Sequence, residues 1–431
     1  MTRSFWLVIS LVFGLSLVGL VAHRGELVTL AIPLLAYLAM AIWRSPDQLA
    51  LTVKRRLSTD KATQGTVVEA RVSLTSQGTM VEEFHLVDHP PGGILLQDGV
   101  LSHAGPLPPG GGVELEYRLT AGRGRYIFDS LHAVGNDPFG LFFVEKTLSE
   151  AVTLLVYPKI ADLSSIPIRP PNTKGFTGPI PSRKSGTGMD FFGVRDYQQG
   201  DSLRRINWRM SARHVQDLFT NEFEQERIAD VGLILDARQQ YNYISGHRQI
   251  FESSVMATAS LADVFLEDGH AVSLVTFGAG IARVFPGYGK VQRERILRAL
   301  ANARTGYNFA LDNLGNLPAR LLAPRTQLVY ISSLSPEDIR PLLRFRAQGY
   351  DVLIISPDPL RFELAGETGA STPDWLLAAR FARLERDLLI KQLVRSAIRV
   401  IDWDVDQPLS QAIEGVQLQL PLRYRSIRVL V

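Results

Sequence analysis

The chain of 431 residues contains no cysteine, which excludes disulfide bonds, thiolate zinc sites, iron–sulfur clusters and a cysteine nucleophile. It also lacks an excess of one charge, because 46 Lys and Arg face 43 Asp and Glu, a formal net charge of +3. Nucleic-acid-binding proteins usually concentrate more positive charge, so a nucleic-acid partner is not favoured. A G-x-x-x-x-G-K-[ST] phosphate-binding loop is missing, and no Ser/His/Asp arrangement stands out. The sequence therefore predicts a protein that is not an enzyme, with no cofactor.

Two long apolar segments open the chain. Residues 5–22 carry no charge, residues 27–43 carry none either, and only His-Arg-Gly-Glu separates them. At a helical rise of ~1.5 Å per residue, each segment could cross a hydrocarbon core of roughly 30 Å. A cleaved signal peptide is the alternative, because Arg3 precedes an apolar stretch, but it would leave the second segment unexplained. We predict a transmembrane hairpin within residues 1–48.

Basic residues near the ends of these segments predict the orientation of the hairpin. They lie mainly outside the connection between the segments, at Arg3, Arg44, Lys54, Arg55 and Arg56, and Arg24 alone opposes them. We therefore expect a multi-pass protein of the inner (cytoplasmic) membrane, whose soluble domains face the cytoplasm.

Residues 49–160 show the pattern of a small antiparallel β-sandwich. Apolar and polar residues alternate in runs such as GTVVEARVSL and VELEYRLTA, and turn clusters such as HPPGG separate these runs. Residues 122–143 indicate a final hairpin with an Asp-Pro-Phe-Gly turn at Asp137. Residues 161–190 are rich in Pro, Gly, Ser and Thr, which indicates a linker or an extended arm packed on a neighbour.

The last part of the chain, residues 191–431, predicts a motif arm followed by a doubly wound α/β domain. From about residue 228, short apolar runs such as VGLILD and DVLIIS alternate with helical stretches, as expected for a parallel sheet covered on both faces. Ser335 and Pro336 indicate the start of one helix, and another is expected over residues 374–396, before the strand IRVIDWD.

Residues 191–213, FFGVRDYQQGDSLRRINWRMSAR, form the most distinctive stretch, with five arginines interleaved with aromatic residues. Arginines and aromatics together could bind single-stranded nucleic acid. The acids Asp196, Asp201 and Asp217 would instead repel phosphate and pair with the arginines. A self-paired arm bracing the α/β domain and a docking surface for a protein are the other two interpretations. We expect at least one Arg–Asp pair within residues 195–217 to form inside the fold.

This stretch resembles the signature of a bacterial family known as domain of unknown function 58. The residues that carry the resemblance are Phe191, Arg195, Tyr197, Gly200, Asp201, Arg204, Ile206, Trp208, Ser211, Ala212 and Arg213. The hairpin at 122–143 and the two apolar segments also look like those of the family. The resemblance implies a membrane-anchored protein with a von Willebrand factor A-like domain. It also implies association with a MoxR-type AAA+ ATPase in the maturation or remodelling of protein complexes.

The end of the first strand of the α/β domain departs from metal-binding A domains. Those domains bind Mg²⁺ with Asp-x-Ser-x-Ser, a distant Thr and a second Asp, because hard cations need several converging oxygens. Here Asp236 is present, but Arg238 and Gln240 replace the two serines. The distant positions offer Tyr307 or Asn308, and Ser333. Asp236 is thus a weak metal candidate in a degenerate site, and we expect no bound metal.

Two functions remain open from the sequence. The first is a membrane-tethered, non-enzymatic adaptor or scaffold that works with a MoxR-type ATPase. Its docking residues would be those of the motif: Arg195, Tyr197, Gly200, Asp201, Arg204, Trp208 and Arg213. The alternative is an enzyme or ligand-binding protein of envelope metabolism with a degenerate site near Asp236.

Overall fold

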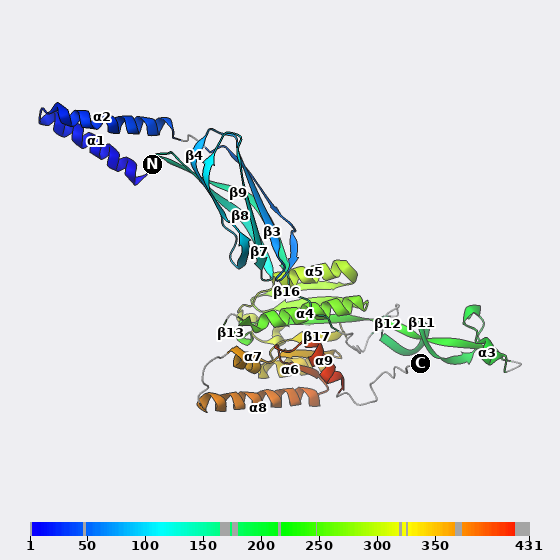
Figure 1. Ribbon diagram of the computed structural model, residues 1–431. Coiled ribbons are helices and arrows are strands. Elements are labelled where there is room, and N and C mark those ends of the chain that lie inside the picture. Colours follow the sequence, from blue (N-terminus) through cyan, green and yellow to red (C-terminus); the bar gives the residue numbers. More distant parts are fainter. Residues whose placement is uncertain are drawn as a thin grey trace. The chain divides into compact units, whose positions relative to one another are not determined.

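The computed structural model describes residues 2–45, 49–163, 173–174, 180–213, 217–246, 248–318, 321–324, 326–366 and 373–418. The chain divides into two compact units, Met1–Tyr157 and Pro158–Val431. Figure 1 labels the elements of both units.

The first unit begins with two apolar helices, α1 (Arg3–Val21) and α2 (Gly25–Trp43), which pack against each other. They approach closely at Gly19, where a Cβ atom would lie 2.7 Å from Val28 Cγ2. Only 17% of each span is buried, and side chains such as Trp6 and Leu20 are exposed. The core helix of a soluble protein would be mostly buried, so these helices suggest membrane association. Each has 19 residues and is long and apolar enough to cross a membrane.

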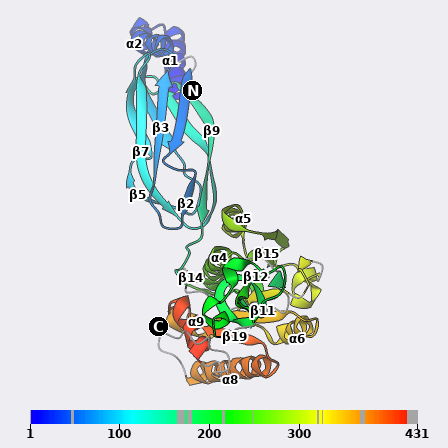
Figure 2. The same ribbon diagram turned by 90° about the vertical axis from the view of Figure 1, so that its right-hand side faces the viewer.

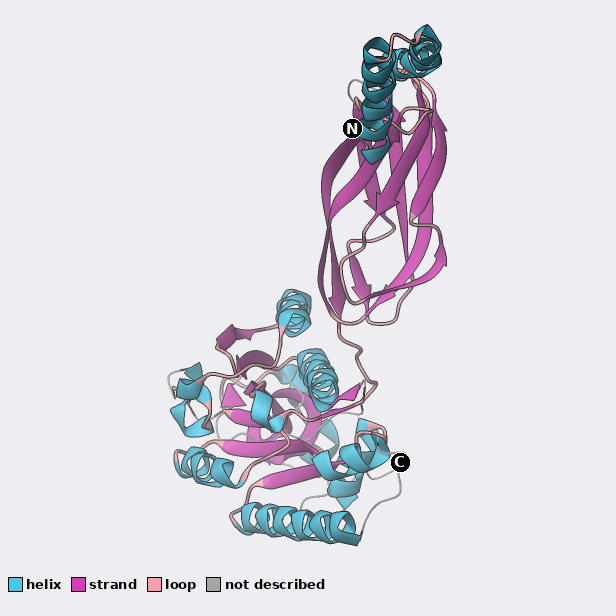
Figure 3. Ribbon diagram, turned by 90° about the vertical axis from the view of Figure 1, so that its left-hand side faces the viewer, coloured by secondary structure: helices cyan, strands magenta, loops and turns pink. Residues whose placement is uncertain are grey.

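The rest of the first unit is a sandwich of two sheets, drawn in magenta in Figure 3. One sheet has the order β1-β3-β7-β5, with bounds Leu51–Leu57, Val68–Ser76, Gly112–Ala121 and Ile94–Gly99. The other has the order β2-β9-β8-β4-β6, with bounds Lys61–Thr63, Phe143–Tyr157, Gly124–Asn136, Val81–Asp88 and Ser102–Leu107. Neighbouring strands are antiparallel except β2 and β9. The alternation in β7 buries Val113, Leu115 and Leu119 in the shared core, as the sequence pattern predicts.

The predicted hairpin over residues 122–143 is longer than expected. Residues 124–136 form one strand, β8, and its antiparallel partner β9 starts only at Phe143. The Asp-Pro-Phe-Gly turn is therefore the tip of a hairpin that ends at Tyr157 rather than a turn within 122–143. The end of the hairpin was predicted wrongly because polar residues on the exposed face of β9 interrupt the alternation of apolar and polar residues in this strand.

The turn at Asp137 joins the two apolar helices to the sandwich. The buried Asp137 carboxylate accepts hydrogen bonds from the backbone amides of Leu141 (2.7 Å) and Phe142 (2.6 Å), which fixes the turn. Both apolar helices are bonded to this turn. The Thr2 amide donates to the Leu141 carbonyl (2.9 Å), and the Tyr37 hydroxyl donates to the Phe139 carbonyl. The two helices thus pack on one end of the sandwich through the motif that the sequence marked only as a turn.

The second unit is built on an eight-stranded sheet in which six strands follow the order β16-β15-β12-β17-β18-β19, and two further strands pair with β12 off this path. The bounds are Ile281–Gly287, Ala271–Phe277, Phe219–Asp236, Gln327–Ile331, Asp351–Pro357 and Arg399–Trp403. All neighbours in this order are parallel except the edge strand β16. Numbered along the chain, this order is 3-2-1-4-5-6, which is a common order of doubly wound sheets. The mixed α/β architecture predicted for this part is therefore confirmed.

Helices cover both faces of this sheet. Their bounds are α4 Ile250–Glu267, α5 Gly289–Asn302, α6 Ile339–Ala347, α7 Pro359–Gly366, α8 Pro373–Arg395 and α9 Leu409–Leu418. Figure 2 shows α4 and α6 on opposite sides of the strands. Ile234 of β12 packs in the same core cluster as Phe345 of α6 and Leu393 of α8. A capping box at Ser335 confirms the predicted helix start, although its first turn is a 3₁₀ turn.

A long antiparallel pair projects from the centre of the sheet and forms the motif arm. It consists of β11 (Ile180–Asp196) and the first half of β12, joined through a short helix, α3 (Trp208–Ser211). A two-residue strand, β10 (Thr173–Lys174), also pairs with β12. Residues 180–190, the end of the segment predicted as a linker or an extended arm, belong to strand β11. Most of residues 161–179, in the same predicted segment, lie outside the described residues.

Candidate functional site

A buried polar cluster lies at the carboxyl end of β12. Asp236 ends this strand, Ser332 follows the neighbouring strand β17, and Asp338 lies in the first turn before α6. These ends meet because parallel strands present their carboxyl ends at one edge of the sheet, where α/β proteins place their sites. Asp236, Ser332 and Asp338 are all at most 2% exposed.

The guanidinium of Arg238 occupies the centre of this cluster. Its Nη2 atom lies 2.7 Å from Asp236 Oδ2 and 2.9 Å from Asp338 Oδ1, and its Nε lies 3.0 Å from Asp236 Oδ1. Its Nη1 donates to the Asp312 carbonyl at 2.8 Å, and the guanidinium stacks 4.2 Å from the Tyr241 ring centre. One arginine therefore pairs with two buried carboxylates through Nε and Nη2, while its Nη1 is bound to a backbone carbonyl.

Burial and charge set the protonation of this cluster. Burial raises the pKa of Asp338 to about 6, and Arg238 only partly offsets this while Asp236 adds to it. Burial also raises the pKa of Tyr330, with Asp236 and Asp338 adding to the effect, so its phenol stays protonated. The Tyr330 hydroxyl donates to Asp236 Oδ2 at 3.0 Å, and Ser332 Oγ donates to the same oxygen at 2.7 Å. Every oxygen of Asp236 is thus engaged by a donor.

The residues at this edge do not fit a divalent cation. A magnesium site needs a near-octahedral set of oxygens around an open centre, and here a guanidinium fills that centre. Among the described residues, no group of three or more His, Cys, Asp or Glu side chains could hold a metal. The Asp236 carboxylate is instead paired with Arg238.

The other residues considered for a metal site lie outside the cluster. Tyr307 is 61% exposed, and the Asn308 side chain caps a 3₁₀ turn and donates to the Ala279 carbonyl. Ser333 is buried, but its hydroxyl has no hydrogen-bond partner and does not reach Asp236. Asp338 and Tyr330 were missed by the sequence analysis. The available signal for Asp338 was an acid three residues after the N-cap Ser335, in the first helical turn that follows β17.

A second arginine fills the neighbouring strand ends. Arg386 of α8 is 7% exposed and donates to Asp402 Oδ1 (2.6 Å), Ser356 Oγ (2.9 Å) and the Ser333 carbonyl (2.9 Å). Arg383, one turn earlier, pairs with the buried Asp358. The carboxyl edge of β17, β18 and β19 is therefore closed by the side chains of a helix, as the edge at β12 is closed by Arg238.

The motif arm holds its arginines differently. Arg195 forms a two-pronged pair with Asp201, with Nη1 to Oδ2 at 2.8 Å and Nη2 to Oδ1 at 2.7 Å, and its Nε donates to Glu222 at 2.9 Å. Asp201 also accepts from the Gln198 amide, and Gly200 takes a φ of +111° in this turn. The hydrogen bond from Arg195 lowers the pKa of Asp201. The predicted Arg–Asp pair is thereby confirmed.

The tip of the arm exposes apolar side chains. Within residues 203–218, Leu203 is 69% exposed, Trp208 65%, Leu218 45% and Met210 39%. Arg204, Arg209 and Arg213 are exposed on the same short segment. We call these seven residues the arm tip. Exposed large apolar residues beside arginines are typical of protein-binding surfaces.

The remaining motif residues support the arm. Ile206 is 5% exposed and bridges to Thr220, and Tyr197 is partly buried with its amide bound to the Leu218 carbonyl. Trp208, named above among the docking residues, is exposed. The side chains of Phe191 and Phe192 lie outside the described part of the chain. The motif thus combines structural residues, led by Arg195 and Asp201, with an exposed set.

The arm tip and the Arg238 cluster lie at opposite ends of one strand. From Glu222 to Asp236, β12 extends about 46 Å at a rise of ~3.3 Å per residue. A single ligand of small size cannot contact both regions.

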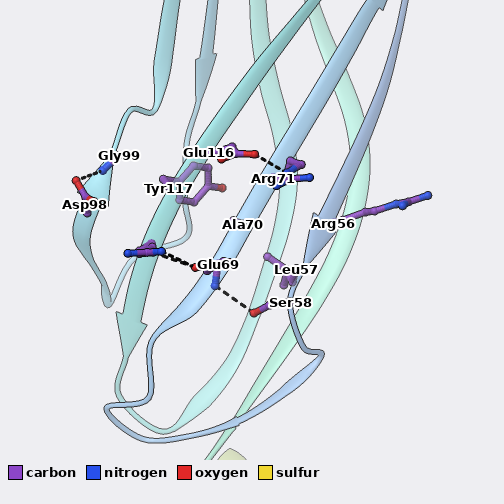
Figure 4. A pocket seen from close by; sticks show the side chains of 11 residues that line it. Arg56, Leu57, Ser58, Glu69, Ala70, Arg71, Asp98, Gly99, Glu116 and Tyr117 are labelled. Carbon is purple, nitrogen blue, oxygen red and sulfur yellow. Dashed lines mark hydrogen bonds and ion pairs between the residues drawn. The ribbon is translucent and has the colours of Figure 1, made fainter.

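The sandwich carries a groove of about 480 Å³, shown in Figure 4. Ion pairs Arg71–Glu116 (2.6 Å) and Arg118–Glu69 (2.9 Å) span its lining. Because these charges satisfy one another at an exposed sheet face, we assign no function to the groove.

Comparison with known proteins points to the same stretch of the chain. Residues 193–373 match the family described as "Protein of unknown function DUF58". This match starts within the motif and includes β12, the Arg238 cluster and α6. It supports the family resemblance that the motif residues indicated.

One curated relative and several solved structures show further similarity. The chain is 30% identical over 184 residues to the uncharacterized protein YeaD of Bacillus subtilis (strain 168), covering 42% of this chain and 43% of that protein. The chain thus spans less than half the length of this relative. A FixG-related protein from Vibrio parahaemolyticus is 10% identical with a TM-score of 0.17, over 25% of this chain and 96% of that chain. The DNA glycosylase AlkC of Pseudomonas fluorescens is 10% identical with a TM-score of 0.17, over 29% of this chain and 38% of that chain. Scores this low support no argument about fold.

Proposed function

We propose that the chain is a membrane-tethered, non-enzymatic adaptor that presents the arm tip to a protein partner. The observation that carries this proposal is the exposure of Trp208, Leu203 and their neighbouring arginines in the connection at the tip of a projecting strand pair. The two apolar helices would anchor the chain in the inner membrane with its soluble units in the cytoplasm. The second unit would be a von Willebrand factor A-like domain, in keeping with its 3-2-1-4-5-6 sheet order.

The proposed partner is a MoxR-type AAA+ ATPase, as the family resemblance implies. The chemistry of the arm tip supports a protein rather than a small ligand. Tryptophan and arginine are the residues that most often dominate binding energy at protein interfaces. Acidic residues on the ATPase would pair with Arg204, Arg209 and Arg213 and would fix the orientation of the complex.

The closed strand ends weigh against the rival proposal of an enzyme or ligand-binding site near Asp236. Arg238 and Arg386 occupy the edge where a doubly wound sheet would bind a substrate, and both are at most 7% exposed. The charges of this edge are satisfied internally, and a ligand would have to displace buried ion pairs.

A pull-down of the full chain in detergent from its native host, with and without ATP, tests the adaptor proposal. The test variant is Trp208→Ala/Arg204→Ala, and Arg195 stays in place because it holds the turn at Asp201. The matched control is Arg304→Ala/Tyr307→Ala, which also removes an exposed arginine and an aromatic, but beside the strand ends.

We expect the wild type and the control to recover an AAA+ ATPase and the arm-tip variant to lose it at least about tenfold, a change of about 1.4 kcal/mol. If only the control variant failed to recover the ATPase, the docking surface would lie at the strand ends instead of at the arm tip. Recovery of nucleic acid that disappears steeply with salt would replace the adaptor proposal by nucleic-acid binding. Failure of every form to recover an ATPase would overturn the proposed partner.

A further inference from the structure

Helix α8 carries apolar residues on two opposite faces. Leu389 and Leu393 on its inner face are 8% and 0% exposed and belong to the core beneath the sheet. On the outer face, Leu377, Phe381, Leu384 and Leu388 are 56%, 61%, 60% and 65% exposed. Figures 1 and 2 both place α8 at the periphery of the second unit. A surface helix normally has polar residues on its outer face, so this exposed apolar stripe indicates a surface that binds a partner.

The spacing of the outer stripe is that of a coiled-coil seam. Residues 374, 377, 381, 384, 388 and 391 follow one another at alternating steps of three and four, which keeps them on one line of the helix. We call these six residues the α8 seam. The four central members are apolar, whereas Asp374 at one end is acidic and Lys391 at the other is basic.

We propose that the α8 seam pairs antiparallel with the α8 seam of a second copy of this chain. In an antiparallel pair, one helix runs up while the other runs down. Two residues therefore lie at the same level along the helix axes when their numbers add up to the same total as Asp374 and Lys391 do. Phe381 then packs on Leu384 of the second copy, and Leu377 packs on Leu388. The same register brings Asp374 to Lys391 of the second copy, so both ends of the seam close with opposite charges.

The residues beside the seam support this orientation. Arg380 flanks the seam on the same side as Asp387, and the antiparallel register brings each beside the other across the two-fold axis. A parallel pair would instead align Asp374 with Asp374 and Lys391 with Lys391, which places like charges opposite each other. Antiparallel packing also aligns the helix dipoles favourably. Mixed charges along the seam, rather than a basic face, favour a second copy over a lipid surface.

Because the chain contains no cysteine, introduced cysteines report on this contact without background. Two single variants, Asp374→Cys and Lys391→Cys, are prepared as full chains in detergent or nanodiscs and oxidised separately and as a mixture. We expect a disulfide-linked dimer in the mixture, between one chain of each kind. Each variant alone should give little, because identical positions in an antiparallel pair lie about 25 Å apart at ~1.5 Å per residue. Equal cross-linking by the single variants, or none in the mixture, would overturn the proposal.

A second set of variants tests the apolar part of the seam. Adding Leu384→Asp to both cysteine variants should reduce the linked fraction at least about tenfold, because it buries a carboxylate at the centre of the pair. Leu95→Asp, at a 67% exposed leucine of the sandwich, is the matched control and should leave the linked fraction unchanged. A Leu384→Asp chain that melts like wild type and still cross-links fully would contradict the seam.

Charge exchange gives a readout that does not touch the apolar residues. Here the reporting cysteines are Arg380→Cys and Asp387→Cys, again in a mixture. Lys391→Asp should weaken their cross-link, and Asp374→Lys added to the same chains should restore it. Failure of the double exchange to restore the cross-link would overturn the antiparallel register.

Discussion

Arginines lie beside each end of strand β12, and the two ends use them in opposite ways. At the carboxyl end, Arg238 is enclosed between two carboxylates and is 2% exposed. At the arm, Arg195 holds one turn while Arg204, Arg209 and Arg213 stay exposed beside apolar side chains. The first arrangement closes a site where doubly wound sheets usually bind ligands. The second leaves a surface available to a partner. Arginine content alone therefore does not indicate binding, and burial and pairing decide its role.

Removal of the enclosed arginine is the strongest test of the difference between the two ends of β12. Arg238→Ala leaves Asp236 and Asp338 buried without a counter-charge, and we expect the second unit to lose about 3–5 kcal/mol of unfolding free energy. Arg204→Ala at the arm tip should change it by less than about 0.5 kcal/mol. Urea unfolding of the full chain in detergent measures both. Equal losses in the two variants would remove the distinction between the two ends.

A cation should replace the guanidinium once room is made for it. Arg238→Ser leaves the oxygens of Asp236, Asp338 and Ser332 around an open centre. We expect Mg²⁺ at ten to a hundred times its dissociation constant to stabilise this variant by roughly 1–3 kcal/mol, and EDTA to reverse the effect. The wild type should respond to neither addition in a thermal melt. A wild type that gains stability from Mg²⁺ would show that Arg238 does not close the site.

The pH dependence of stability should differ between wild type and Asp338→Asn. Because the pKa of Asp338 is raised to about 6 in the folded chain, the folded state binds its proton more tightly than the unfolded state does. This contribution to stability is complete below about pH 4 and is lost as the pH rises through 6. Asp338→Asn should lack that loss, so the difference between the two proteins should change between pH 4 and 7. A difference that is constant across this range would contradict the raised pKa.

The smallest effect is expected at the paired arginine of the arm. Arg195→Ala removes the pair with Asp201 near the surface, where solvent weakens ion pairs, so global stability should change little. The turn that Asp201 holds should loosen locally, and the Gln198 amide should exchange its hydrogen faster than in wild type. Lysine at position 195 should not restore protection, because it cannot form the two-pronged pair. Unchanged exchange in Arg195→Ala would mean that the turn holds without this arginine.

Local patterns in the sequence were sufficient for most elements of the fold. The apolar runs predicted strands such as β12 and β18, and the capping residues at Ser335 predicted the start before α6. The hairpin at Asp137 was placed correctly at its turn but not at its ends, because its second strand mixes exposed and buried faces. The Arg195–Asp201 pair could be predicted from the sequence because the two residues are only six positions apart.

Pairs between side chains that are far apart in the sequence could not be predicted from it. Arg238 and Asp338 are 100 positions apart, and only the winding of the sheet brings the start of α6 beside the end of β12. The same is true of Arg386, whose partners Ser356 and Asp402 come from two other strands. Asp236 and Arg238 could be identified from the sequence, but Asp338, the second carboxylate of the cluster, could not.

The sequence by itself determined the classes of structure in this protein. Long apolar segments make the first two helices, alternation makes the sandwich, and buried runs make the parallel sheet, because periodicity is a local property. Only the tertiary structure decided which charges are enclosed and which surfaces are left open. Helix α8 shows the reason: its sequence has two apolar stripes, and packing on the sheet buries Leu389 and Leu393 while it leaves the α8 seam exposed.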